Sequence, residues 1–455
     1  MEQKTKSKRL ANRPRVVIIG GGFSGIECAR NLRRSHAEVI VIDRNNHMAF
    51  QPLLYQVATG VLSENAIASP LRRIFEKQNN VTVLMADIKK IDVDEKSLRF
   101  SDSLIYWDYL VVAAGMENNY FGNSHWEKYC PGLKTVAEAS NIRARILSAF
   151  ENAERSFALG KDKDVDGWLT FVIVGGGATG VELAGAIKQL AVNRLSQEFN
   201  NINMTKTRVL LVDCKSRILS SMSVKSSTSA QHALERYGVE VLTNTAVTDV
   251  TSTYIKLNET SIPTRTVIWA AGVAGSPLAA QLADPLGIQL SRSGKIPVNP
   301  DLTVANRSDI RVIGDLVQLE DPQTKKEIPG VAQAALQMGR YAGRSINFSI
   351  QNKTLKKRIG PFKYHDKGAI ATVGRGYAVL DASGIQLSGS IAWLIWAIAH
   401  IYFLINFRSR LAALWSWMLA YIFNSGINEL IIANNVYSKD TLDLAIHDEK
   451  KQSSI

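Results

Sequence analysis

Two glycine-rich segments have the residue types and the spacing that hold a dinucleotide. Residues 20–25 have the sequence GGGFSG and residues 175–180 the sequence GGGATG, so both match GxGxxG. In this pattern the first glycine permits a tight turn, the second lets the backbone approach a pyrophosphate, and the third lets helix and strand pack closely. The helix that follows adds amide donors and the positive end of its dipole. The chain therefore carries the residues for two dinucleotide sites.

An acidic residue follows each segment at the end of the next apolar strand. These acids are Asp43 and Asp213, and a carboxylate in that place accepts hydrogen bonds from a ribose. In the second segment it favours the free 2′-hydroxyl of NADH over the 2′-phosphate of NADPH, a preference that the neighbouring Lys215 and Arg217 weaken. The alternative for Asp213 is a carboxylate that only caps its own loop.

One tightly bound, non-covalent FAD and one exchanging nicotinamide nucleotide are the simplest pair of dinucleotides for such a chain. Flavin accepts a hydride and releases electrons singly or in pairs, which a nicotinamide alone does not do. A further apolar strand, within 310–315, ends in Gly314-Asp315, where an acid would bond the ribityl chain of FAD. We therefore expect FAD at the first segment and NADH at the second.

Short apolar strands and the helices between them must position these segments. The first such unit runs from a strand at 15–19 through a helix at 26–34 to a strand at 38–42. Buried β-branched runs that alternate with helical patterns are typical of parallel βαβ units. The same order recurs with a strand at 169–174, a helix at 181–195 and a strand at 208–212.

The predicted fold class is α/β, with two Rossmann-like dinucleotide-binding domains and a C-terminal, membrane-associating helical region. We expect the FAD domain to be discontinuous, with the NADH domain inserted into it. The charged stretch 160–167 is predicted to be a linker, and a helix is predicted to begin near Val331. The predicted boundaries are a basic tail at 1–13, the FAD domain at 14–160 and 285–360, the NADH domain at 161–284, a C-terminal region at 361–437 and a polar tail at 438–455.

Composition excludes several classes of protein. The 455 residues predict two or three domains, and the formal charge of +13 fits a surface with scattered Lys and Arg. No zinc knuckle, RNA-binding aromatic signature or long basic helix supports nucleic acid as a partner. The three cysteines lie far apart without a CxxC pair, so we expect no disulfide framework, no metal site and a reducing, cytoplasmic setting. The basic start has no apolar stretch and predicts no cleaved secretory signal.

Two apolar stretches near the C-terminus are unusual for a water-exposed surface. Residues 391–407 are apolar nearly all round, interrupted by His400 and Asn406, and a second stretch runs over 411–423. As a helix the first stretch would span about 25 Å, slightly short for crossing a bilayer. We expect a monotopic pair of helices on the cytoplasmic face of the cell membrane; the alternative is a buried interface in a homodimer. The residues expected at the lipid interface are Trp393, Trp396, Trp415, Trp417, Arg408 and Arg410.

Five further stretches add to the glycine segments, and the two at 332–337 and 366–375 are far more specific than any glycine segment. They are FQPLLYQVATG at 50–60, YFG at 120–122, GVELAG at 180–185, AQAALQ at 332–337 and DKGAIATVGR at 366–375. Together with the glycine segments, they resemble the type II, non-proton-pumping NADH:quinone oxidoreductases of the two-dinucleotide-binding-domain flavoprotein superfamily, over nearly the whole chain. The resemblance implies an enzyme that passes electrons from NADH through FAD to a quinone at a membrane surface.

The resemblance also implies roles for four residues. Gln333 and Gln337 would contact the quinone, and their spacing of four puts both on one helix face; the alternative is two polar residues on an ordinary amphipathic helix. Lys367 would lie near the flavin pyrimidine ring, where a cation stabilises negative charge, whereas a lone lysine is otherwise solvated. Glu182 would face the flavin and order NADH or relay protons to the quinone. The simpler interpretation of Glu182 is an acid in the first turn of its helix, at the positive end of the dipole.

Motifs and resemblance together give two sets of residues expected to contact cofactors. The set for FAD is Gly20, Gly22, Phe23, Ser24, Gly25, Asp43, Arg44, Ile88, Gly115, Gly314, Asp315, Ala332, Gln333 and Lys367. The set for NADH is Gly175, Gly177, Thr179, Gly180, Glu182, Asp213 and Gly272.

Three other functions stay open from the sequence. A sulfide:quinone oxidoreductase shares the fold but needs paired reactive cysteines beside the flavin, and no cysteine follows Cys214. A second alternative is a relative of the type II enzymes that reduces a specialised quinone or prefers NADPH. From another class, the chain would be a flavin-binding sensor or assembly factor that uses the scaffold without turnover.

Overall fold

The structure, a computed structural model, describes residues 13–101, 103–351, 359–382, 384–422 and 428–431. It divides into two compact units, each assembled from separate stretches of the chain. Unit 1 is formed by the described parts of 1–48, 69–117 and 273–367, and unit 2 by those of 49–68, 118–272 and 368–455. The predicted polar tail and all but the last residue of the predicted basic tail lie outside the described residues. The domain boundaries proposed from the sequence stay predictions.

Unit 1 is built on a six-stranded sheet. Five of its strands are parallel, and the edge strand at 303–304 is antiparallel to its neighbour. The Val and Ile residues of the strand at 15–19 are fully buried, as expected for a strand covered on both faces. The strand order is β20 (Thr303–Val304), β21 (Arg307–Val312), β9 (Tyr109–Val112), β1 (Arg15–Ile19), β2 (Glu38–Asp43) and β5 (Val81–Met85).

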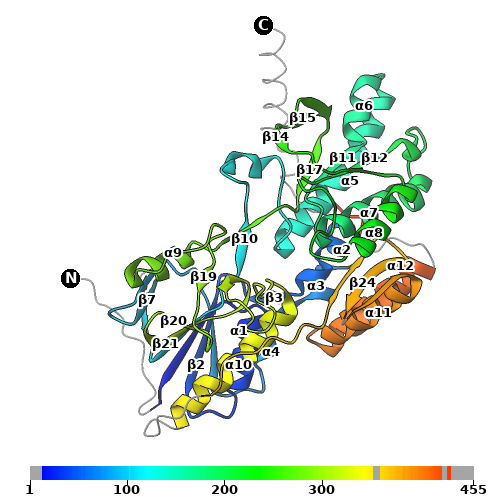
Figure 1. The fold of residues 1–455 in the computed structure, drawn as a ribbon. Coiled ribbons are helices and arrows are strands. Elements are labelled where there is room, and N and C mark those ends of the chain that lie inside the picture. Colours follow the sequence, from blue (N-terminus) through cyan, green and yellow to red (C-terminus); the bar gives the residue numbers. More distant parts are fainter. Residues whose placement is uncertain (1–12, 102, 352–358, 383, 423–427, 432–455) are drawn as a thin grey trace, which may run out of the picture. The chain divides into compact units, whose positions relative to one another are not determined.

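Two helices of unit 1, α1 (Phe23–Asn31) and α10 (Ala332–Gln351), pack closely against each other (Figure 1). A Cβ atom on Gly339 would lie 2.2 Å from the Ser24 carbonyl oxygen, and one on Gly343 would lie 2.6 Å from the Cys28 carbonyl oxygen. Neither distance is tolerable for a real side chain, so only glycine permits this approach. The contact fixes α10 against the helix that follows the first glycine segment.

The smaller elements of unit 1 include a three-stranded antiparallel sheet and two short helices. They are β6 (Lys90–Asp92), β7 (Ser97–Phe100), β8 (Ser103–Tyr106), α4 (Leu71–Ile74) and α9 (Leu278–Ala283).

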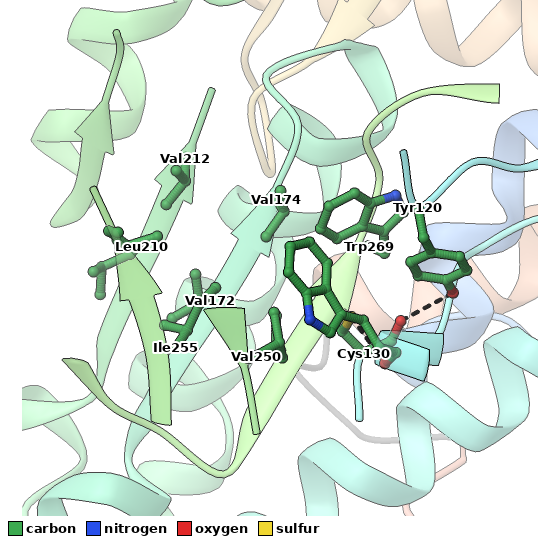
Figure 2. Close-up of a cluster of buried hydrophobic side chains, with 12 residues drawn as sticks. Tyr120, Cys130, Val172, Val174, Leu210, Val212, Val250, Ile255 and Trp269 are labelled. Carbon is green, nitrogen blue, oxygen red and sulfur yellow. Dashed lines mark hydrogen bonds between the residues drawn. The ribbon is translucent and has the colours of Figure 1, made fainter. Parts of the chain in front are cut away.

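Unit 2 contains a parallel sheet of four strands, with the order β13 (Val239–Leu242), β12 (Arg208–Val212), β11 (Thr170–Val174) and β17 (Thr266–Trp269). Successive side chains of β11 point to opposite faces of this sheet, and each face packs against a different part of unit 2. Phe171 packs on Phe150 of helix α5 (Val136–Ala158), with ring centroids 5.1 Å apart. Val172 faces a buried cluster that includes Trp269 and Tyr120, where the Tyr120 hydroxyl donates to the Cys130 carbonyl oxygen (Figure 2).

The remaining helices and strands of unit 2 come before, between or after these sheet strands in the chain. Helix α7 (Ala178–Asn193) connects β11 to β12 in the chain, and helix α8 (Val224–Arg236) connects β12 to β13. An antiparallel meander is formed by β14 (Val247–Val250), β15 (Tyr254–Leu257) and β16 (Thr260–Pro263). The segment with the FQPLLYQ motif forms η1 (Gln51–Leu53) and α2 (Leu54–Ala58).

The C-terminal part of unit 2 is an antiparallel sheet followed by two helices. The sheet consists of β23 (Ala369–Thr372), β24 (Ala378–Ala382) and β25 (Ile385–Gly389). The helices are α11 (Ser390–Phe403) and α12 (Phe407–Ile422), with 14 and 16 residues. Within the described part of the chain, every helix is too short or too polar to cross a bilayer.

The predicted strands and helices are present at both glycine segments, with one error between them. The strand predicted at 208–212 is β12, and the helix predicted near Val331 is α10. The linker predicted at 160–167 is wrong, because this stretch contains helix α6 (Asp162–Trp168). Gly160, at φ +68°, only ends the preceding helix, and its charged neighbours do not oppose helix formation.

Candidate functional site

The first glycine segment has the geometry that its sequence requires. Gly20 has φ +104°, and a Cβ there would lie 2.2 Å from the Ala113 carbonyl oxygen. A Cβ on Gly25 would lie 1.9 Å from the Gly20 carbonyl oxygen, so this glycine lets α1 start against β1. A Cβ on Gly22 would meet nothing within 4 Å, which leaves open space at the start of the helix. The segment therefore fits a pyrophosphate that approaches the backbone at Gly22.

The second glycine segment repeats this geometry in unit 2. Gly175 has φ +114°, and a Cβ there would lie 2.7 Å from the Ala270 backbone. A Cβ on Gly180 would lie 1.9 Å from the Gly175 carbonyl oxygen, and one on Gly177 would meet nothing within 4 Å. Thr179 is exposed at the start of α7. The chain thus builds the same phosphate-binding turn twice.

The two strand-end acids cap the glycine segments. Asp43 Oδ2 accepts from the Gly21 amide at 2.7 Å, and Asp213 Oδ2 accepts from the Gly176 amide at 2.6 Å. The other oxygen of each carboxylate accepts from a backbone amide two residues later, at 2.7 Å in both cases. Loop capping is therefore real, but each oxygen has a second lone pair, so capping does not exclude a ribose hydroxyl.

The cations beside Asp213 are held by their own loop. Arg217 donates to the carbonyl oxygens of Leu219, Ser220 and Met222, at 3.3, 2.7 and 2.9 Å. Lys215 Nζ donates to Ser220 Oγ at 3.0 Å. Their positive groups therefore bind protein oxygens.

Gly314 and Asp315 lie close to the first glycine segment, as the FAD prediction requires. A Cβ on Gly314 would lie 2.7 Å from Ser24 Oγ and 3.9 Å from the Ala335 side chain on α10. Gly314 also donates its amide to the sulfur of Met338 at 3.4 Å. The first glycine segment, this acidic turn and α10 therefore converge within unit 1.

The other residues expected at FAD are spread around unit 1. Arg44 forms an exposed ion pair with Glu117 at 3.0 Å. Ile88 is buried, and Phe23 is half-buried as the first residue of α1. Gly115 has φ +68°, and a Cβ there would meet nothing within 4 Å.

Gln333 and Gln337 both use their amides to hold the segment that contains Lys367. Gln333 Oε1 accepts from the Lys367 backbone amide at 3.0 Å. Gln337 makes two bonds of 2.9 Å to His365, donating to its carbonyl oxygen and accepting from its amide. Ala332 starts the same helix, and the Lys367 side chain is exposed. The structure thus brings three of the four proposed catalytic residues together in unit 1.

Glu182, the fourth, belongs to unit 2 and is buried. It is the fifth residue of α7, so the interpretation of an acid in the first helical turn is wrong. Its Oε1 accepts from the Thr372 amide at 3.4 Å. Burial raises the pKa of Glu182 to about 8, and the Thr372 amide only partly offsets this effect. The protonated form of the carboxyl is therefore favoured.

Sequence reasoning missed two residues beside this acid. The Tyr55 hydroxyl lies 3.1 Å from Thr372 Oγ1, and both side chains are buried. Burial raises the pKa of Tyr55 well above its ordinary value, and the nearby Glu182 adds to the effect. Tyr55 lies in the motif at 50–60 and Thr372 in the motif at 366–375, so the two motifs were the available signal. Nothing in the sequence indicated that these two motifs contact each other.

Sequence reasoning also missed an aromatic residue at the NADH set. A Cβ on Gly272, at φ +70°, would lie 2.4 Å from Cζ of Phe121. Phe121 is 63% exposed, and its ring lies 6.4 Å from that of Trp269. The YFG motif thus places an exposed aromatic ring directly over Gly272.

Helices α11 and α12 each bury one apolar face and expose another. Trp396 and Trp417 are buried and pack on each other at 5.3 Å, so the prediction that they lie at a lipid interface is wrong. Trp415 is 60% exposed, in agreement with that prediction. The other large apolar residues exposed on these helices are Ile391, Leu394, Ile395, Ile398, Tyr402, Phe403, Phe407, Leu411 and Leu414.

The arginines between the helices differ in their contacts. Arg410 donates to the carbonyl oxygens of Leu404 and Tyr402, at 3.0 and 2.9 Å, and so caps the end of α11. Arg408 is exposed. The contact of Arg408 with lipid phosphates therefore stays a prediction.

Comparisons with known proteins agree with this geometry. Residues 14–339 match the pyridine nucleotide-disulphide oxidoreductase family. The chain is 38% identical over 430 residues to the type II NADH:quinone oxidoreductase Ndh of Mycobacterium tuberculosis, covering 92% of this chain and 90% of that protein.

Two solved structures share the fold. NDH2 of Plasmodium falciparum in complex with NADH matches with a TM-score of 0.83 at 20% identity, over 91% of this chain and all (100%) of that one. The sulfide:quinone oxidoreductase of Aquifex aeolicus matches with a TM-score of 0.65 at 18% identity, over 90% and 95%. These likenesses confirm the predicted α/β class with two Rossmann-like domains. With the sequence match over nearly its full length, the chain belongs to the type II NADH:quinone oxidoreductases.

Proposed function

We propose that this enzyme oxidises NADH and reduces a quinone by two electrons, through a non-covalent FAD held by unit 1 and without pumping protons. The observation that carries the proposal is the duplicated cradle: two turns with the same glycine geometry, each closed by an acid. FAD, when bound, supplies the redox chemistry that side chains lack, because it takes a hydride and gives up electrons.

Unit 1 fits FAD because its first glycine segment, Asp43 and the turn at Asp315 would hold the two ends of such a molecule. The open space at Gly22 admits the pyrophosphate, and Asp43 keeps lone pairs for the ribose. Asp315 lies on the turn beside Ser24, where it would accept from ribityl hydroxyls. The remaining members of the FAD set, including Arg44, Ile88 and Gly115, would line the same molecule.

Unit 2 would bind NADH in preference to NADPH. Asp213 disfavours a 2′-phosphate through charge repulsion. Lys215 and Arg217, which would attract that phosphate, are held by oxygens of residues 219–222. Gly177 and Thr179 would lie by the pyrophosphate of NADH. Gly272, which the Phe121 ring covers, would lie beside the same nucleotide.

Glu182 would hold a proton for quinone reduction. Conversion of a quinone to a quinol takes up protons as well as electrons, and a group with a pKa near the working pH both gives and regains a proton. Burial gives Glu182 a pKa of about 8.

Gln333 and Gln337 would contact the quinone and fix Lys367. Each amide already bonds to backbone at 365–367, yet each keeps hydrogen-bonding capacity, since an amide offers two donors and two acceptor lone pairs. The exposed Lys367 side chain would supply positive charge beside the flavin ring.

The exposed faces of α11 and α12 would dip into the cytoplasmic face of the cell membrane, where quinone is dissolved. A row of apolar side chains at helical spacing, including Ile391, Ile398, Phe407 and Leu411, is costly in water and favourable in lipid. Flotation of the full chain with phospholipid vesicles tests this: binding lost on replacing Phe407 and Leu411 by serine supports a lipid surface. If the same variant still bound vesicles but no longer formed a dimer, the exposed apolar face of α11 and α12 would instead be assigned to a homodimer interface.

The first experiment is NADH oxidation by the purified, detergent-solubilised protein with a water-soluble quinone, with bound-flavin absorbance as a second readout. We expect NADH to bleach the flavin and the quinone to restore its absorbance. NADPH and sulfide serve as competing donors. Bleaching by NADPH alone would move the assignment to a relative that prefers NADPH, and bleaching by sulfide alone to a sulfide:quinone oxidoreductase.

Two alternatives have specific observations against them. Within the described residues, Cys28 and Cys130 are buried, and burial raises the pKa of each thiol to about 12, so neither is a reactive thiolate for sulfide. Cys214 is exposed, but a single exposed cysteine does not supply the pair that a sulfide:quinone oxidoreductase needs. A flavin-binding sensor or assembly factor has no need of a buried acid with a pKa near 8. No response of the flavin to any donor would nonetheless favour the sensor.

A further inference from the structure

A series of hydrogen bonds runs through unit 2 from α12 to Glu182 by way of Thr372, which uses its side chain for one bond and its backbone amide for the next. Trp417 Nε1 donates to Gln56 Oε1 at 2.6 Å, and Gln56 Nε2 donates to the Tyr55 hydroxyl at 3.0 Å. The Tyr55 hydroxyl lies 3.1 Å from Thr372 Oγ1. The Thr372 amide then donates to Glu182 Oε1 at 3.4 Å. Four contacts therefore connect an indole on a C-terminal helix with the buried acid.

Every member of this series is buried. The exposed fractions are 5% for Trp417, 2% for Gln56, 6% for Tyr55, 1% for Thr372 and 7% for Glu182. A buried polar group that loses its partner costs free energy, so each member constrains the next. Gln56 is the central member, because its oxygen and its nitrogen are both engaged.

The environment of Glu182 contains little charge. The groups that face it are Thr372 on β23 and Tyr55 on α2, and Tyr55 is in turn affected by Tyr421 on α12. Both tyrosines are neutral at working pH, and burial raises their pKa values further above the ordinary one. Among the described residues, the shift at Glu182 has two causes, burial and the Thr372 amide. A pKa that depends on exclusion of water depends on the packing of the elements that exclude it.

A small cavity marks where water would reach this series. It has a volume of about 80 Å³ and is bordered by Tyr55, Gln56, Arg375, Trp393 and Tyr421. That volume suits a few water molecules and is too small for a substrate ring. Arg375 closes one side, since its guanidinium donates to the Tyr421 carbonyl oxygen and lies over the Tyr421 ring. Loosening of α12 would widen this cavity toward Tyr55.

We infer that Trp417, Gln56 and Tyr55 are positioning residues for Glu182, through which the packing of α12 against the rest of unit 2 keeps water away from the catalytic acid. The inference rests on the proposed function, because it takes Glu182 as the proton donor. Trp417 does not touch the reacting groups; it acts by holding Gln56. The same helix exposes Leu411, Leu414 and Trp415 on its other face, so one element joins the outer surface to the acid.

The test compares Trp417→Phe with Trp415→Phe in the full-length, flavin-loaded enzyme. Trp417→Phe keeps a ring against Trp396 but removes the indole N–H, whereas Trp415 is an exposed tryptophan of the same helix. We expect Trp417→Phe to move the alkaline limb of the pH profile of quinone-dependent turnover to lower pH by about one unit. Above pH 8, turnover should fall about three- to tenfold, which is the size of effect typical for the loss of a buried hydrogen-bond partner. NADH-driven flavin bleaching should stay within about twofold, because it does not use this proton.

A second measurement does not depend on turnover. The infrared band of a protonated carboxyl, assigned by its loss in Glu182→Gln, is titrated with pH in each variant. Trp417→Phe and Gln56→Ala should lower its midpoint, Trp415→Phe should leave it unchanged, and Trp417→Phe should have no further pH effect in the Glu182→Gln background. An unmoved midpoint in Trp417→Phe, with the band present and the flavin bound, would overturn the inference.

The outcome separates this inference from the proposed function. If Glu182→Gln left the alkaline limb in place, Glu182 would not be the proton donor, and the proposed function would fail at that residue. If Glu182→Gln removed the limb while Trp417→Phe and Gln56→Ala left it unshifted, the coupling alone would fail.

Discussion

The two dinucleotide cradles are almost the same in backbone and differ in the helix behind the turn. The first glycine has φ +104° in unit 1 and +114° in unit 2, and the third glycine would clash at 1.9 Å in both. After the turn, α1 offers Ser24 and Cys28 to the glycines of α10, whereas α7 carries the buried acid Glu182. The comparison teaches that the two turns share one backbone geometry, and that the units differ in what the helix behind the turn presents: a close backbone contact with α10 in unit 1 and a buried acid in unit 2.

Removing the third glycine is expected to separate the two cradles most strongly. Gly25→Ala places a Cβ 1.9 Å from the Gly20 carbonyl oxygen, so the purified protein should lose most of its flavin, about tenfold or more in occupancy. Gly180→Ala creates the same clash in unit 2 and should keep flavin while raising the KM for NADH by a similar factor. Flavin-to-protein absorbance and NADH titration measure the two effects. Equal flavin loss in both variants would break the assignment of cofactors to units.

Glu182→Gln is expected to have the next largest effect. Quinone-dependent turnover should fall about 10- to 100-fold, the usual range for a lost acid–base group, with flavin bleaching by NADH preserved. The pH dependence of stability should change as well. Because the folded pKa of about 8 exceeds the ordinary value of 4.5, the wild-type protein loses stability as pH rises between these values, and the variant should not. Urea unfolding at pH 5 and pH 9 checks this, and parallel losses in both proteins would contradict it.

Asp213→Asn and Asp43→Asn sharpen the comparison at the ribose. Asparagine keeps the size and part of the loop capping but removes the charge. We expect Asp213→Asn to raise the KM for NADH about three- to tenfold and to narrow its advantage over NADPH. Asp43→Asn should weaken flavin retention and leave the NADPH:NADH ratio unchanged. A changed ratio in Asp43→Asn would mean that the nicotinamide nucleotide binds in unit 1.

Gln337→Ala is expected to give the smallest effect. It breaks both bonds to His365 and should raise the KM for several quinones about two- to fivefold, since one neutral amide is lost. Arg340→Ala, on the exposed side of the same helix, serves as the control. Quinone reduction that stays intact with several quinones in Gln337→Ala would remove this residue from the quinone site.

The cradles were predictable from the sequence because each is local. Every residue that shapes a turn lies within a few positions of it, and the strand and helix periods on either side identify the context. The glycine φ values and the capping acids therefore follow from spacing alone. The error at α6 is also local, because Gly160 ends the preceding helix and does not begin a linker.

The surroundings of Glu182 were not predictable, because they depend on distant pairings. Tyr55 and Thr372 are 317 positions apart, and Thr372 and Glu182 are 190 apart. No periodicity in one sequence reports such contacts. Similarly, the apolar stretches that form α11 and α12 gave no sign that Trp396 and Trp417 turn inward while Trp415 turns outward. A helix that is apolar on all sides conceals which side is buried.

Proton binding at Glu182 should in turn affect how tightly α12 packs on the rest of unit 2. Linkage between two equilibria in one molecule is reciprocal, so whatever helix packing does to proton affinity, proton binding does to helix packing. When Glu182 ionises above about pH 8, the charged carboxylate disfavours the dry arrangement that Trp417 and Gln56 maintain. The packing of α12 on the rest of unit 2 should therefore weaken in alkali.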